Sequence, residues 1–369
     1  MEHERLIIEI AGAEQTDLYT DLITLEVELD DELAGMFRLT LATAPQADGS
    51  WPYLDDERLV VWQPVTIAVG FDSGVEELIS GFLTHIRPSF DPDPTRSTLE
   101  LWGMDGSVLM DRVEKRQAWP SQKDSDIAAA LFRAYGFTPQ MDDTAVIHDE
   151  AISTIIQRET DMQFLKRLAL RNGYDCYVEG ETGYFRRPLL DETPQPLLAA
   201  HFGQETTVIR FSAEINALAP THVSMAQLDR FNKEVLVATV EENTQTALGD
   251  TTASALLPPG MESPQTLIGM NTTTGLQEME ALCRGLFDEA DWFVTGEGVI
   301  DARTYGHVLK PRRTVTIKGV GETYSGIYYV NHVTHTLSAE GYQQAFRVKR
   351  NGIKPTGAED FTAPANGLI

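Results

Sequence analysis

Two histidines and three pairs of neighbouring acids are the residues whose type and spacing best suit chemistry. His332 and His335 could chelate a metal ion only if their side chains pointed the same way. They lie in a predicted strand, where an odd separation sends side chains to opposite faces, so we expect structural histidines. Glycoside hydrolysis needs two carboxylates that flank one bond. With 56 acids in the chain, neighbouring acids are expected by chance. The pairs are Asp55-Asp56, Asp142-Asp143 and Glu241-Glu242.

Glycines and cysteines do not indicate a catalytic or cofactor site either. Gly296-Glu297-Gly298 and Gly319-Val320-Gly321 lack the full dinucleotide fingerprint and the lysine of a phosphate loop, so we interpret them as turns. No Gly-x-Ser-x-Gly elbow is present for a serine nucleophile. Cys176 and Cys283 have no paired metal spacing, and we expect buried thiols. The sequence therefore predicts no enzyme, no metal and no cofactor.

Length and charge limit the classes of protein that the chain can belong to. A chain of 369 residues predicts two or three domains. The net charge of −27 argues against nucleic-acid binding and against adsorption to an anionic membrane. No apolar run approaches the ~20 residues that a membrane-spanning helix needs. Residues 1–5 lack the features of a signal peptide, so we expect folding in the cytoplasm.

The first part of the chain reads mainly as strands. Apolar and polar residues alternate with period two, and the connectors are rich in turn-forming residues. Many strands with no helical period predict a β-barrel-like domain over residues 1–115. The predicted strands are Arg5–Ile10, Ile23–Leu29, Gly35–Thr43, Val65–Val69, Leu78–Ile86 and Thr98–Trp102.

Residues 116–199 read as an inserted α/β domain. A first helix begins at Asp124 or Ser125 and ends before Gly136. A second helix begins with Asp161 as N-cap and ends at Asn172-Gly173, a pair that tolerates a left-handed backbone. A hairpin of strands Tyr174–Val178 and Tyr184–Arg187 follows. The helix is too short to be stable alone, so its apolar arc must pack on a neighbour.

Strands return after the insertion. Residues 200–242 are predicted to complete the first β-barrel-like domain, and residues 243–263 read as a loop or linker. Thr274 with Gln277 predicts a capping box before one helix. That helix and the strands up to Arg350 predict a second β-barrel-like domain over residues 264–352. Residues 353–369 are expected to be a flexible tail.

A weak internal repeat relates the two β-rich domains. Val65–Ile67, Ser80–Leu83 and Leu99–Leu101 occur in the same order and spacing as three segments near the C-terminus. Ser-Gly between strands is common, so chance explains the match as well as descent does. If the two domains are related, three chains would close a ring of approximate six-fold symmetry. The C-terminal segments are Val315–Ile317, Ser325–Tyr328 and Ala345–Val348.

The segment around the second predicted helix resembles the signature of the late-control protein D family. The matching positions are Gln157, Asp161, Phe164, Leu165, Arg167, Leu168, Asn172, Gly173 and Tyr174. The resemblance extends to the C-terminal part of the chain. The matching positions there are Gly326, Tyr328, Val330, His335 and Tyr342.

This resemblance implies a structural role. Members of the family are baseplate hubs of contractile phage tails, and the hub half of type VI secretion spike proteins is similar. Such hubs are homotrimers that join a three-fold spike to a six-fold tube. The resemblance implies the homotrimer, a spike (tip) protein, the inner tube protein and other baseplate components as partners, within an assembled tail or injection particle. Type VI spike proteins continue into a needle, whereas this chain stops about 20 residues after its last predicted strand, so we expect a separate spike protein.

Two other classes stay open on the residues alone. A monomeric carbohydrate-binding or glycan-hydrolysing β-rich protein would bind glycans through exposed aromatic side chains. An adhesin or fibre module would show trimeric stalk repeats, which we do not find in the sequence. Trimer formation requires an apolar patch, although burial inside the monomer is the commoner fate of aromatic residues. The candidates for the patch are Trp51, Trp62, Trp102 and Trp292.

Overall fold

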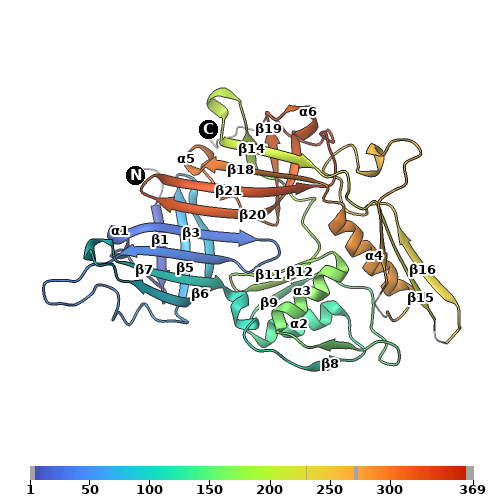
Figure 1. Ribbon diagram of the computed structural model, residues 1–369, viewed down its shortest axis with the longest axis horizontal. Helices are drawn as coiled ribbons and strands as arrows, with labels where there is room; N and C mark the ends of the chain where they lie inside the picture. Colours follow the sequence, from blue (N-terminus) through green and yellow to red (C-terminus); the bar gives the residue numbers. More distant parts are fainter. Residues whose placement is uncertain (1–4, 230, 270–272, 363–369) are drawn as a thin grey trace.

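The computed structural model describes residues 5–229, 231–269 and 273–362. Strands dominate the chain, and the longer helices α2, α3 and α4 lie together on one side of it (Figure 1). The predicted fold class, mainly β with an α/β insertion, is confirmed. The strand pairings divide the chain into four parts, which we call the first strand group, the insertion, the second strand group and the α4 unit.

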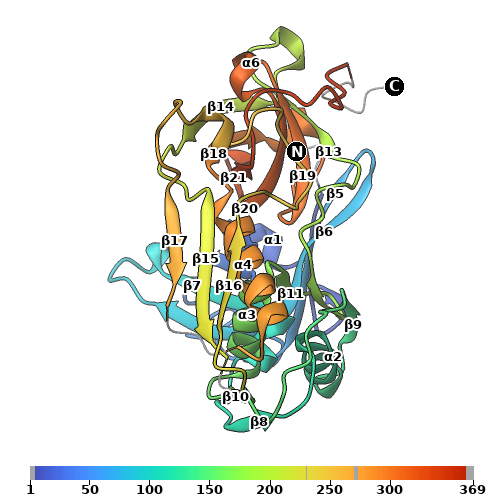
Figure 2. The same cartoon turned by 90° about the vertical axis from the view of Figure 1, so that its right-hand side faces the viewer.

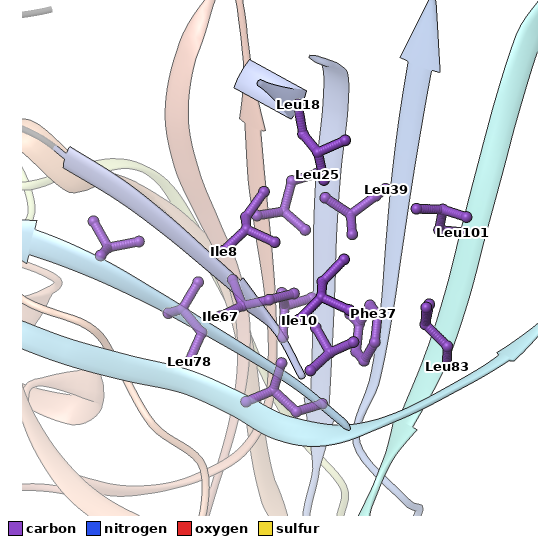
Figure 3. Close-up of a cluster of buried hydrophobic side chains, with 14 of the residues drawn as sticks. Ile8, Ile10, Leu18, Leu25, Phe37, Leu39, Ile67, Leu78, Leu83 and Leu101 are labelled. Atoms are coloured by element: carbon purple, nitrogen blue, oxygen red, sulfur yellow. The ribbon is translucent and has the colours of Figure 1, made fainter. Parts of the chain in front are cut away.

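The first strand group covers residues 5–105. Side chains alternate along its strands, so that Leu25 and Val27 are fully buried while Glu28 is exposed. Ile23, the first residue of the predicted strand Ile23–Leu29, is 43% exposed beside a register shift at the start of β3. Figure 3 shows the core that these strands enclose. The elements are β1 (Arg5–Ile10), β2 (Ala13–Glu14), α1 (Leu18–Asp21), β3 (Leu22–Asp30), β4 (Met36–Ala42), β5 (Pro64–Phe71), β6 (Gly74–Ser89) and β7 (Thr98–Asp105).

The insertion follows as two helices beside a three-stranded sheet. Both predicted helices and the predicted hairpin are present, with bounds shifted by one or two residues. A separate apolar core lies between α2, α3 and the hairpin. The elements are β8 (Gln117–Trp119), α2 (Asp124–Ala134), β9 (Thr138–Met141), β10 (Ile155–Gln157), α3 (Asp161–Asn172), β11 (Asp175–Glu179) and β12 (Thr182–Arg186).

The second strand group has its own core, separate from that of the first group. Its strands come from two stretches of the chain, residues 195–215 and 294–350. The elements are β13 (Gln195–Ala199), β14 (Val208–Ile215), β18 (Val294–Asp301), α5 (Ala302–Tyr305), β19 (Arg313–Lys318), α6 (Gly321–Tyr324), β20 (Gly326–Ser338) and β21 (Gly341–Arg350).

The α4 unit was not predicted as a part of its own. It consists of β15 (His222–Leu228), β16 (Val235–Val240), β17 (Gln265–Ile268) and α4 (Leu276–Ala290). The apolar arc of α4 packs on the inner face of this three-stranded sheet rather than on the second strand group. The expectation that residues 200–242 complete the first β-rich domain is therefore wrong. β14 pairs with β18 in the second strand group. β15 pairs with β16, and the apolar face of these two strands is covered by α4.

Both strand groups belong to one large sheet with the order β14-β18-β21-β20-β3-β4-β7-β6-β5-β1-β2. The joint is β20, which pairs with β21 along one edge. Its other edge has two different partners. The first part of β20, Gly326–Val330, pairs with β19, and the second part, His332–Ser338, pairs with β3. Among the described residues these pairings form an open path, so each predicted barrel-like domain is an incompletely closed strand group.

The connecting segments are more firmly attached than expected. Leu248 in the predicted linker is buried, and Thr251 forms a β-bridge with Ile353 at the start of the predicted flexible tail. The rest of that tail prediction, residues 363–369, lies outside the described residues. No helix in the described ranges is long and apolar enough to cross a membrane. The 3₁₀ turns are η1 (Pro94–Arg96), η2 (Gly106–Met110), η3 (Gly203–Glu205) and η4 (Ser254–Leu256).

Candidate functional site

The first turn of α3 holds a buried carboxylate that ties three segments together. Thr160, not the predicted Asp161, is the N-cap, because its hydroxyl accepts the amide of Gln163 at 3.3 Å. Asp161 is free to pair with Lys115, and its carboxylate also accepts the Tyr135 hydroxyl at 2.7 Å. Burial alone would raise the pKa of Asp161, but the bonds from Lys115, then Gln157 and Tyr135, lower it.

Gln157 extends this network towards β8. Its side-chain amide donates to Asp161 Oδ1 at 2.7 Å, and its carbonyl oxygen accepts the indole N–H of Trp119 at 3.2 Å. Gln157 is fully buried, so these bonds satisfy groups that water cannot reach. The polar members of the sequence signature therefore have structural partners at the start of α3.

The apolar members of the signature form the contact of α3 with the insertion core. Phe164, Leu165 and Leu168 are fully buried. Arg167 is exposed at the border of this apolar face, where its Nε donates to Glu159 at 2.6 Å and its guanidinium stacks over Phe164. The helical period of the sequence thus places the signature residues correctly.

The end of α3 meets α4 at two glycines. Gly173 has φ +66°, as predicted for the left-handed end of a helix. A Cβ added at Gly285 of α4 would lie 2.7 Å from the amide nitrogen of Gly173, so the two helices touch through backbone. Asn172 donates to Asp124 at the start of α2 at 2.7 Å, and Tyr174 packs edge-on against Phe185. The last residues of the signature thus set the close approach of three helices.

A buried charge network strengthens this helix contact. His148 Nε2 lies 2.8 Å from Asp124, and its Nδ1 lies 3.5 Å from Glu278 of α4. Arg171 of α3 pairs with the same Glu278. Burial would lower the pKa of His148, but its bonds to Asp124 and Glu278 raise it to about 9. The imidazole is therefore a cation at neutral pH, between two carboxylates.

The insertion meets both strand groups at a stack of aromatic rings and guanidinium groups. Tyr177 and Tyr184 of the hairpin stack with centroids 4.6 Å apart. Arg186 covers the Tyr184 ring at 4.4 Å, and Arg312 covers the Tyr177 ring at 4.0 Å while donating to the backbone oxygen of Asp30. The stack borders a cleft of about 230 Å³. One side chain, that of Arg312, thus contacts all three parts.

A second contact between the same parts lies beneath α4. Lys349 of β21 pairs with Asp31 at 2.9 Å, and the Tyr329 hydroxyl donates to Asp175 of the hairpin at 2.6 Å. Trp292 stacks on Tyr329 with centroids 5.7 Å apart. Burial raises the pKa of Asp175 to about 6. These contacts hold the insertion and the α4 unit against the joint between the strand groups.

The C-terminal signature residues lie in the second strand group and at the joint, away from α3. Gly326 has φ +144°, and a Cβ there would lie 2.6 Å from the guanidinium of Arg350. Tyr328 and Val330 are fully buried in the second core. Tyr342 packs in the first core. The structure therefore does not bring the two signature groups together into one site.

The two candidate histidines have different partners. His332 Nδ1 lies 2.9 Å from Asp30, and His335 Nδ1 lies 2.8 Å from the hydroxyl of Tyr342. Burial lowers the pKa of His335 to about 3. In the part of the chain that the structure describes, no three His, Cys, Asp or Glu side chains gather as a metal site.

The acidic pairs have ordinary ion partners. One acid of each pair lies beside a basic side chain: Asp56 beside Arg58, Asp143 beside Lys123 and Glu241 beside the imidazole of His222.

One of the two glycine predictions is wrong. Gly319 and Gly321 have positive φ, as turns require, but Gly296 and Gly298 lie inside β18. A Cβ at Gly296 would lie 2.8 Å from the ring of Phe211, and one at Gly298 would lie 2.5 Å from that of Phe346. These two glycines are needed because large rings from adjacent strands lie across them.

The tryptophan candidates differ in exposure. Trp62 is 45% exposed beneath the guanidinium of Arg112, whereas Trp51, Trp102 and Trp292 are partly covered. Sequence reasoning missed His148, Arg312 and Lys349. Their partners are 24 to 318 residues away in the chain, so no local pattern marked them.

Solved structures that share this arrangement include phage-tail and secretion-system proteins. The 43 kDa tail protein of prophage MuSo2 from Shewanella oneidensis has 14% identity and a TM-score of 0.67 over 94% of this chain and 98% of its own. A tail protein from Neisseria meningitidis MC58 has 14% identity and the same TM-score over 95% and 98%. The Escherichia coli c3393 protein, a component of the type VI secretion system, has 11% identity and a TM-score of 0.57 over 93% and 76%.

The chain therefore has the fold of these tail proteins, in agreement with the resemblance in its sequence. No curated protein sequence matches it at a significant level. The family described as the Alg8 N-terminal domain matches residues 4–339. The chain belongs to this family.

Proposed function

We propose that the chain is a structural baseplate hub of a contractile tail or tail-like injection system, as in the late-control protein D family. Three copies form a ring that joins a separate spike protein to the inner tube, without catalysis. The first and second strand groups are the ring-forming parts, and the insertion at residues 116–199 braces them. The shared fold and the exposed edges of the large sheet support this proposal.

The observation that carries the proposal is a run of eight antiparallel strands that ends at the edge of β14 and at the C-terminal part of β6, beyond its pairing with β5. The run is β14-β18-β21-β20-β3-β4-β7-β6, and every neighbouring pair is antiparallel. Because the number of strands is even, the two end strands run in opposite directions. The β14 edge of one copy can therefore pair in antiparallel fashion with the β6 edge of the next.

Both edges are accessible among the described residues. β14 pairs only with β18, and β6 is bonded to β5 and the two residues before it only up to Leu83. Ile209 on β14 is 58% exposed, and His85 and Arg87 beyond the paired part of β6 are exposed too. Unpaired strand edges are templates for pairing with another chain. A contact between two different edges is heterologous, so repeating it closes a ring when the rotation allows.

The exposed side chains on the joined sheet suit the wall of a channel. Glu28, Glu297, Gln343 and Arg347 are exposed and polar, while their strand neighbours face the cores. Three copies would place 24 strands around the axis. A polar wall of that kind stays wetted, which suits a hub that continues a tube.

The test combines native mass with cross-linking between the two edges. We expect a mass of three chains, alone or with the spike protein. A double variant with Ser212→Cys on β14 and Arg87→Cys on β6 should give covalent trimers on oxidation. Further double variants with the cysteines moved to neighbouring positions on the two strands allow for a different register. Each single-cysteine variant is the control and should give none. A monomer that stays monomeric with the spike protein would refute the ring.

A further inference from the structure

The three-stranded sheet of the α4 unit has one covered face and one uncovered face. Val223, Met225 and Ala238 point inwards and are buried against Met279 and Cys283 of α4. In Figure 1, α4 lies between this sheet and the rest of the molecule, and Figure 2 shows the sheet from its other side. The side chains that alternate with the buried ones therefore point away from the molecule.

Five of these outward side chains are apolar and lie next to each other, and the uncharged polar side chains of Ser224, Thr239 and Gln265 lie beside them. We call Ala226, Leu228, Val235, Val237 and Leu267 the outer face. Ala226 is opposite Val237, and Leu228 is opposite Val235. Leu267 of β17 is opposite Ser224, which points to the same side of the sheet as Ala226. All five are exposed, with 58–72% for the four larger side chains.

The outer face differs from the rest of this acidic surface. The chain carries a net charge of −27, yet no charged side chain lies on the outer face itself. Phe231, 71% exposed in the turn between β15 and β16, is a further exposed apolar side chain at one end of this sheet. Soluble monomers rarely expose contiguous apolar patches beyond a few hundred Å², and larger ones mark interaction sites.

The ends of the sheet are acidic. Glu234 stands exposed just before β16, Glu241 and Glu242 stand exposed just after it, and Glu262 lies exposed before β17. Lys233 is the one cation in the described part of this rim. The surface therefore has an apolar centre between carboxylates, which is the usual arrangement of a protein interface with a polar rim.

We infer that the outer face binds a separate protein whose contact surface is apolar at its centre and edged by lysine or arginine. A second copy of this chain fits less well, because it would bring the same acidic rim and the same overall negative charge. The acidic rim steers a basic partner towards the apolar centre. The inference rests on the proposed function, because the spike and tube proteins of the same system are the probes.

The experiment measures binding of the full chain to the spike protein and to the tube protein by titration calorimetry. Val237→Glu places a charge at the centre of the outer face without touching the α4 core. Val75→Glu is the matched control, because Val75 is 64% exposed on the β5–β6 hairpin, in a different part. Leu267→Glu is a second variant, in case the first fails to fold. Hydrogen exchange of α4 checks the fold of each.

We expect one of the two proteins to bind, with at least ten-fold weaker binding for Val237→Glu and less than two-fold change for Val75→Glu. Binding should weaken as salt rises, because the rim contacts are between opposite charges. Equal binding of the variant and the wild type, or no binding of either protein, would overturn the inference. A fall in native mass of the isolated Val237→Glu chain would assign the face to a second copy and overturn it too.

The two proposals fail in different ways. If edge cross-linking yields no trimer while Val237→Glu still abolishes binding, the ring is wrong and the outer face stands. If trimers form and both variants bind as the wild type does, the ring stands and the outer face is wrong.

Discussion

Replacing His148 by glutamine tests the buried charge network between α2, α3 and α4. His148 is 1% exposed and lies between the carboxylates of Asp124 and Glu278. Its pKa is raised from 6.5 to about 9, because these two bonds outweigh the cost of burial. Glutamine keeps a hydrogen-bonding side chain of similar reach but cannot carry the charge. The variant therefore isolates the effect of the proton.

The expected magnitude follows from the shift in pKa. About 2.5 units at 1.36 kcal/mol each correspond to at most about 3 kcal/mol of stability. The folded pKa is higher than the unfolded pKa, so this stability is fully present below pH 6.5. It is lost as the pH rises through 9. We expect the wild type to exceed His148→Gln most at pH 6 and to converge with it above pH 9.

Hydrogen exchange of peptides from α2, α3 and α4, corrected for the intrinsic rate at each pH, measures this difference locally. Subtracting the variant from the wild type cancels the titration of other groups, provided that these do not contact residue 148. His85→Gln is the control, because His85 is exposed and bonds only to its neighbour Thr84 among the described contacts. A wild-type advantage that does not change between pH 6 and pH 9.5 would refute a charged His148.

Three further substitutions probe the other contacts. Gly285→Ala should destabilise the α3–α4 contact by about 1–3 kcal/mol in thermal unfolding, because its Cβ would lie 2.7 Å from backbone, whereas Gly269→Ala meets nothing within 4 Å and should not. Arg350→Met should lower the free energy of unfolding by about 3 kcal/mol, because the guanidinium donates to the backbone carbonyls of Leu248, Ser325 and Lys354. Residues 246–263 should then be cleaved faster by a protease, and unchanged cleavage would contradict this. Asp175→Asn should raise the free energy of unfolding above pH 6, because the raised pKa of Asp175 means that its ionisation disfavours the folded state. Urea unfolding measures this difference, which should vanish below pH 4, where the carboxyl is protonated in both states.

Local patterns in the sequence predicted the elements better than their ends. The apolar period of α3 and the glycine at its end were sufficient to place that helix, and the two-residue alternation was sufficient for β3 and β4. The cap of α3 is one residue earlier than predicted, because Thr160 takes the capping bond and leaves Asp161 for Lys115. The competing partner is 46 residues away, which a local pattern cannot register.

The assignment of strands to sheets was predicted less well. β14 and β15 have similar alternation, yet β14 joins the large sheet and β15 forms the inner face against α4. Gly296 and Gly298 have the spacing of a turn, yet they lie inside β18 beneath aromatic rings. In each case a distant segment decides the outcome: β18 for β14, α4 for β15, and the rings of Phe211 and Phe346 for the two glycines.

Local sequence was enough to predict the strand-rich class, the two helices of the insertion and the signature at α3. These depend on contacts between residues a few positions apart, which composition and period record. The joint at β20, the junctions at Arg312 and Lys349, and the uncovered outer face of the α4 unit became apparent only from the folded arrangement. These depend on which surfaces distant segments cover, because apolar faces and buried charges are stable only with the partners that the complete fold provides.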